Sequence, residues 1–123
     1  MMGRVDLSTT DALSTSIERR DGATILAVSG VVDLATSPPL EELIGQLVDE
    51  CPACLIIDLT AVTFFASIGL RILAETHERL ASSARFAVVS TEPVTARPIQ
   101  LTKLDQFLAL YPTVEDAITA LGS

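Results

Sequence analysis

The sequence predicts a single α/β domain, in which helices pack on a mixed, mostly parallel β-sheet in the order β-β-α-β-α-β-α-β-α. The length of 123 residues suits one domain. Short apolar segments alternate with amphipathic ones, which is typical of parallel strands joined by crossover helices. The pair Asp21-Gly22 indicates a hairpin near the N-terminus, which adds an antiparallel strand pair to the sheet.

Composition and charge argue against several classes of function. Sixteen acidic and eight basic residues give a net charge of −8, which disfavours nucleic-acid binding because phosphate backbones attract positive charge. No apolar run approaches the roughly 18 residues of a membrane span, and no signal-peptide pattern is present, so we expect a cytoplasmic protein without a membrane partner. Aromatic residues make up 4%. Since small-molecule pockets are often lined by aromatic side chains, we expect neither an enzyme nor a bound cofactor.

The N-terminal part divides into a tail and a hairpin. Residues 1–13 are small and polar without a sustained period, so we expect a flexible tail there and a domain over residues 14–121. The apolar positions of Thr15–Arg19 and Ala23–Ser29 predict the two strands of the hairpin.

A helix is predicted to follow from Ser37, whose hydroxyl would cap free N–H groups ahead of two prolines. The helix has a single apolar stripe at helical spacing. The stripe consists of Leu40, Leu43, Ile44, Leu47 and Val48.

The central part predicts a buried strand, a loop and a second helix. Cys54–Leu59 is a continuous apolar run after a helix, which indicates a strand buried on both faces. We expect Thr60–Ala66 to be a connection, a helix to run from Ser67 to about Ser82, and Phe86–Ser90 to be a further central strand.

The C-terminal part is less regular. In Thr91–Leu104, Pro93 can open a helix, whereas Pro98 would remove a hydrogen bond inside one. Phe107–Tyr111 is predicted to be an edge strand. Thr113-Val-Glu-Asp116 resembles a capping box and predicts a last helix.

The pair Cys51 and Cys54 has the spacing of a redox motif. In thioredoxin-like sites such a pair follows a strand and opens a helix, whose N-terminus lowers the pKa of the thiol. Here the pair follows a helix and leads into a strand, so the preferred interpretation is a loop cysteine and a buried strand cysteine. His77 is the only histidine, which is too few ligands for a zinc site, and we expect no metal.

The segment around Ser67 carries the clearest functional signal. As a helix N-cap, a serine stabilises by about 1 kcal/mol. Gly69 is unexpected in a first turn, where glycine costs about 1 kcal/mol relative to alanine, and this indicates that a partner or a phosphate approaches the backbone. A phosphate on Ser67 would meet free N–H groups and the positive end of the helix dipole.

Two motifs and the element order over about residues 14–121 resemble the STAS family, specifically its stand-alone anti-sigma factor antagonists, and imply a single STAS-type domain. The first motif is Gly30-Val-Val-Asp33, with Thr36 three residues on. The second comprises Asp58-Leu59, Val62, Phe64-Phe65, Ser67 and Gly69-Leu70.

The resemblance implies a partner-switching regulator. The unmodified protein would bind an anti-sigma factor that is also a serine kinase, and thereby free a sigma factor. The kinase, with ATP on its own chain, would phosphorylate Ser67 and end the interaction, and a serine phosphatase would reverse the modification. Asp33, Thr36 and Gly69 would lie with Ser67 on the partner-binding surface.

Two alternatives stay open. Ala66 stands where the family pattern has aspartate, and Ile68 where a small or hydroxyl residue is common. These departures favour a scaffold or transport-accessory STAS protein whose Ser67 is never modified. The third interpretation is a binding protein regulated by thiol redox chemistry at Cys51 and Cys54.

Overall fold

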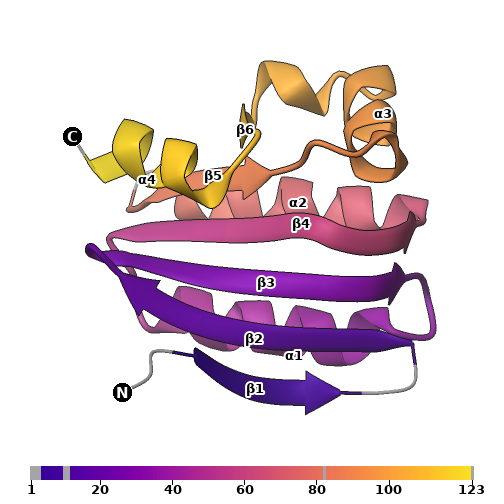
Figure 1. The fold of residues 1–123 in the computed structure, drawn as a ribbon, viewed down its shortest axis with the longest axis horizontal. Coiled ribbons are helices and arrows are strands. Elements are labelled where there is room, and N and C mark those ends of the chain that lie inside the picture. The colour runs from indigo at the N-terminus through magenta and orange to yellow at the C-terminus, as the bar shows by residue number, and fades with distance from the viewer. Residues whose placement is uncertain (1–3, 10–11, 82, 123) are drawn as a thin grey trace.

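The computed structural model describes residues 4–9, 12–81 and 83–122, and for residues 4–9 and 122 it describes the backbone only. Over these residues the chain forms a six-stranded sheet in which spatial order follows chain order (Figure 1). The strands are β1 (Arg4–Thr9), β2 (Leu13–Arg20), β3 (Ala23–Val32), β4 (Cys54–Phe65), β5 (Arg85–Val89) and β6 (Ala109–Tyr111). The helices are α1 (Ser37–Asp49), α2 (Ser67–Leu80), α3 (Pro93–Leu101), the 3-10 turn η1 (Leu104–Gln106) and α4 (Val114–Gly122).

The strand pairing confirms the predicted mixed, mostly parallel sheet. β1 pairs with β2 and β2 with β3 in antiparallel orientation. β3, β4, β5 and β6 pair in parallel. The parallel strands therefore all end at one edge of the sheet, and Figure 1 shows the ends of β3 and β4 on the right.

Residues 4–9, which are expected to belong to a flexible tail, instead form β1 and pair with β2. Residues 1–3 and 10–11 of that predicted tail lie outside the described residues. The missed signal is the alternation of Val5 and Leu7 with polar neighbours, which is typical of a strand. Without β1, the edge of β2 would present unpaired N–H and C=O groups.

The predicted connection Thr60–Ala66 is a second correction, because β4 continues to Phe65 and leaves only Ala66 before α2. β3 also extends beyond its predicted end, to Val32, and supplies a pairing partner for the longer β4. The extension holds Ser67 directly at the edge of the sheet.

The helices cover the two faces of the sheet unequally. The larger apolar core lies under α1, α2 and α3, and α4 covers a smaller core on the other face. Figure 1 shows α1 and α2 behind the sheet and α4 in front. β4 contributes Leu55 and Ile57 to the larger core and Ile56 to the smaller one, which confirms a strand buried on both faces. No helix within the described ranges is long and apolar enough to cross a bilayer.

Candidate functional site

The ends of β3 and β4 bring the two sequence motifs together at one edge of the sheet. Val32 and Phe65 are register partners, and the N–H of Ala66 donates to the carbonyl oxygen of Val32 at 2.9 Å. Asp33 and Ser67 therefore each follow directly after one of the two residues, Val32 and Ala66, that this hydrogen bond joins. The carboxyl ends of parallel strands are where open α/β sheets place their binding sites.

Asp33 and Thr36 hold each other in the turn that leads into α1. Asp33 Oδ1 accepts the N–H groups of Ala35 and Thr36, both at 3.0 Å. Thr36 Oγ1 accepts the N–H of Asp33 at 2.9 Å and donates to the carbonyl oxygen of Val31 at 2.9 Å. Thr36 is buried. It therefore shapes the predicted partner surface from beneath.

The start of α1 differs from the prediction that Ser37 caps it. Thr36 occupies the N-cap position and Ser37 is the first helical residue. Ser37 is buried, and its hydroxyl donates to the carbonyl oxygen of Leu34 at 3.4 Å. The N-cap therefore lies one residue before the serine that the two prolines indicate. The two hydrogen bonds that Asp33 accepts hold the backbone in this position.

Ser67 is the first residue of α2 and is exposed. The N-cap position belongs to Ala66, whose backbone is extended and whose side chain has no polar atom to donate or accept. Within the described residues the Ser67 hydroxyl makes no hydrogen bond. Ser67 is thus not the N-cap of this helix, and its hydroxyl is exposed at the helix end.

Gly69 has a structural explanation that helix propensity does not reveal. A Cβ atom at position 69 would lie 2.5 Å from Cε1 and 2.6 Å from Cζ of Phe65. The missing side chain thus makes room for the Phe65 ring inside the molecule. The expectation that Gly69 leaves its backbone open to a partner or phosphate is replaced by this packing.

Gly30 lies in β3 where the strand passes close to the backbone of Ala12, the residue just before β2. Its φ of +95° favours glycine, and a Cβ atom there would lie 2.1 Å from the carbonyl oxygen of Ala12. That oxygen accepts the N–H of Val31 at 2.7 Å. The glycine of the first motif therefore permits a close backbone approach that supports the Asp33 turn.

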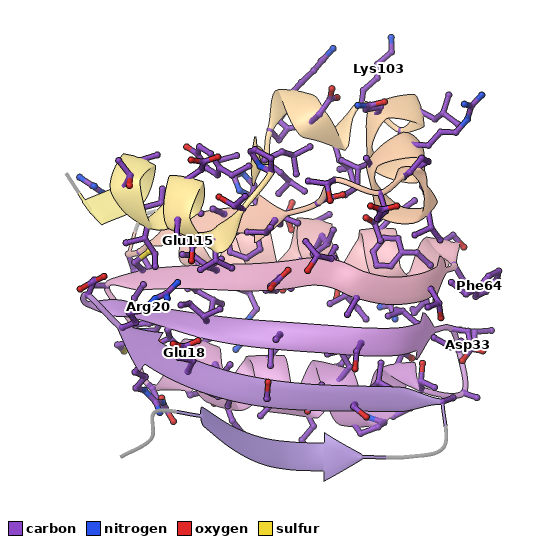
Figure 2. All side chains as sticks on the ribbon, in the orientation of Figure 1. Glu18, Arg20, Asp33, Phe64, Lys103 and Glu115 are labelled. Atoms are coloured by element: carbon purple, nitrogen blue, oxygen red, sulfur yellow. The ribbon has the colours of Figure 1, made fainter. Side chains whose placement is uncertain are left out.

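Two exposed apolar residues at this edge were not predicted from the sequence. Leu34 is 77% exposed in the Asp33 turn, and Phe64 is 53% exposed at the end of β4. Figure 2 shows Phe64 and Asp33 at the same end of the sheet. The signal was present in the doublet Phe64-Phe65, since neighbouring residues of a strand face opposite sides and only one can be buried here.

The two cysteines lie in different environments. Cys51 is exposed in a turn, whereas Cys54 is buried in the core beneath α4. Burial raises the pKa of the Cys54 thiol, and the nearby Arg85 acts in the opposite direction. A raised pKa means less thiolate, which is the reverse of the environment that activates redox cysteines.

The face of the sheet beside α4 carries a hollow over β2, β3 and β4. Its volume is about 460 Å³, and its lining is small and mostly polar. The lining residues are Ser14, Thr15, Ser16, Ala27, Val28, Ser29, Asp58, Thr60 and Ala61. Because no aromatic side chain lines it, the hollow does not resemble a typical small-molecule pocket.

The strand order and the two turns at one edge define a class of small α/β domains with a mixed sheet. Residues 14–117 match the model of the STAS domain, and the chain belongs to the STAS domain family. It is 41% identical over 115 residues to the anti-sigma-F factor antagonist RsfB of Mycobacterium tuberculosis (strain ATCC 25618 / H37Rv), covering 94% of each chain.

Solved structures agree with this assignment. The crystal structure of an anti-sigma factor antagonist from Mycobacterium paratuberculosis superposes with a TM-score of 0.89 at 47% identity, over 95% of this chain and 100% of that one. The phosphorylated form of the Bacillus cell fate determinant SpoIIAA superposes with a TM-score of 0.66 at 16% identity, over 86% of this chain and 97% of that one. The second likeness shows a shared fold.

Proposed function

We propose that this protein is a cytoplasmic anti-sigma factor antagonist that binds an anti-sigma factor with serine kinase activity and so releases a sigma factor. Phosphorylation of Ser67 ends the binding, and a serine phosphatase restores it. The observation that carries the proposal is the free, exposed Ser67 hydroxyl at the start of α2, beside the Asp33 turn. The names of the Mycobacterium relatives support it.

The exposed side chains at the edge suit a protein partner. Leu34 and Phe64 are two of the large apolar side chains that the fold leaves exposed. Both lie at the edge of the sheet where β3 and β4 end and where α2 begins with Ser67. Buried apolar and aromatic anchors supply much of the binding energy of protein interfaces. The edge therefore combines apolar anchors with a hydroxyl that can be modified.

The switch follows from the charge that the modification adds. Ser67 Oγ attacks the γ-phosphorus of ATP held by the kinase, the hydroxyl proton leaves, and ADP departs. The phosphate adds about −1.5 to −2 charges. Unit charges about 4 Å apart interact by about 4 kcal/mol at an effective dielectric of 20. Half of that repulsion from an acidic group of the partner weakens binding more than tenfold, at about 1.4 kcal/mol per decade.

The structure accounts for the two departures that favoured an unmodified scaffold. Ile68 is buried in the larger core, and Ala66 is partly buried against that core. Both side chains thus face the interior of this domain, where an apolar residue packs well. Neither departure removes the exposed hydroxyl of Ser67, so we prefer the switch.

The test is incubation of the protein with kinase-type anti-sigma factors and ATP, followed by intact-mass measurement and peptide mapping. We expect one added phosphoryl group on Ser67, loss of binding by Ser67→Asp, and retained binding by Ser67→Ala. Ser83→Ala is the control, because Ser83 is also exposed but lies after the far end of α2. An unphosphorylated Ser67, together with unchanged binding of Ser67→Asp, contradicts the proposal.

A further inference from the structure

Arg71 lies one helical turn beyond Ser67 on α2. Residues four apart on a helix are neighbours, with Cβ atoms about 5–6 Å from each other. The Arg71 side chain is 52% exposed and is shared between two carboxylates: Nη1 lies 3.1 Å from Oε2 of Glu75, and Nη2 lies 3.5 Å from Oε2 of Glu41 on α1. Exposed ion pairs of this kind are weak, so the guanidinium can change partner at little cost.

Three cations further along the chain, Arg79, Arg97 and Lys103, are less well placed. Arg71 is the only lysine or arginine in residues 67–78. Arg79 lies twelve residues beyond Ser67 and pairs with Asp49. Arg97 and Lys103 belong to α3 and the turn after it, and Figure 2 shows Lys103 apart from the edge marked by Phe64 and Asp33. The nearby carboxylate of Asp33 is engaged within its own turn.

We propose that Arg71 is the internal partner of a phosphate on Ser67, exchanging Glu41 and Glu75 for it; this rests on the proposed modification of Ser67. An anion at position i and a cation at i+4 is the favoured orientation on a helix. A phosphate carries more charge than either carboxylate, and the planar guanidinium matches it with two parallel hydrogen bonds. The N–H groups of Ser67 and Ile68, which precede the first hydrogen bond of the helix, hold the phosphate from the other side, whereas the N–H of Gly69 already donates to the carbonyl oxygen of Ala66.

The exchange has a structural consequence. The pair between Arg71 and Glu41 links α2 to α1 in the unmodified protein. Once Arg71 turns to the phosphate, this link is lost and the phosphate is held against its own helix. The modified Ser67 then occupies the helix end where a partner would dock.

The test uses protein with phosphoserine incorporated genetically at position 67, so that no kinase is needed. The second pKa of the phosphate, ordinarily about 6, is followed by phosphorus NMR across pH 4 to 9. We expect Arg71→Gln to raise this pKa by about 0.3, the size of one exposed i,i+4 ion pair. Arg71→Lys should keep part of the effect.

Arg79→Gln is the matched control on the same helix, and Arg97→Gln and Lys103→Gln test the cations of the neighbouring segment. An Arg71→Gln titration that superposes on the wild-type one overturns the proposal, and so does a larger shift from Arg97→Gln or Lys103→Gln. The two proposals fail separately. A Ser67 that no kinase modifies contradicts the switch, whereas an unshifted phosphate titration contradicts only the role of Arg71.

Discussion

Phe65 and Gly69 fit each other across the junction of β4 and α2: the ring of Phe65 occupies the space in which a side chain at position 69 would begin. Phe65 is the last residue of β4, and it is buried in the larger core. The start of the helix that carries Ser67 is thereby fixed to the sheet by packing.

Gly69→Ala should destabilise the protein by up to about 2 kcal/mol. Overpacking a well-packed core costs about 1–3 kcal/mol, and the roughly 1 kcal/mol that alanine gains in helix propensity offsets part of it. The measurement is urea unfolding. Gly45→Ala is the control, because its Cβ atom would meet only Arg79 Nη1 at 3.6 Å, an ordinary contact. Equal stability changes in the two variants would contradict the packing argument.

The replacement of Thr36 tests whether this residue acts through the turn. Thr36→Val keeps the shape but removes the hydroxyl that Asp33 N–H and Val31 C=O share. Since unsatisfied buried polar groups cost about 1–3 kcal/mol, we expect a loss of stability of that size by chemical denaturation. Thr36→Ser retains the hydroxyl and should lose less. A Thr36→Val protein of wild-type stability that binds the partner weakly would instead assign Thr36 to direct contact.

The exposed apolar residues at the edge should matter for binding and little for folding. Leu34→Ser and Phe64→Ser should each weaken binding of the anti-sigma factor at least tenfold, about 1.4 kcal/mol. Both should leave the thermal unfolding midpoint nearly unchanged, because these side chains are exposed. Phe107→Ser is the comparison, since Phe107 is equally apolar and exposed but follows η1. Binding is measured by titration calorimetry. If Phe107→Ser loses as much affinity for the anti-sigma factor as the other two variants, the partner does not bind specifically at Leu34 and Phe64.

The sequence predicted the α/β class, the strand pairing of the hairpin and the main helices. These follow from hydrophobic periodicity and turn residues, which are local signals. That Asp33 and Thr36 lie beside Ser67 was expected only from the resemblance to the STAS family. The reason for Gly69 was out of reach because it depends on the direction of the Phe65 ring, and propensity alone suggested an external partner. The exposure of Leu34 and the burial of Thr36 likewise depend on the hydrogen bonds of Asp33, which periodicity does not encode.

Cys54 provides the last prediction, which concerns pH. Burial raises the pKa of its thiol above the ordinary value, so in the unfolded chain the thiol ionises at lower pH than in the folded protein. Above the unfolded pKa the unfolded chain binds fewer protons, and the free energy of unfolding therefore falls as the pH rises toward the folded pKa. Denaturant titrations between pH 7 and 10.5 should show this loss in the wild type and in Cys51→Ala, and a smaller loss in Cys54→Ala.

The same burial should make Cys54 react with iodoacetamide more slowly than the exposed Cys51 at pH 8. A Cys54 that is alkylated as fast as Cys51, with no extra loss of stability at high pH, would restore the thiol interpretation that its burial now disfavours.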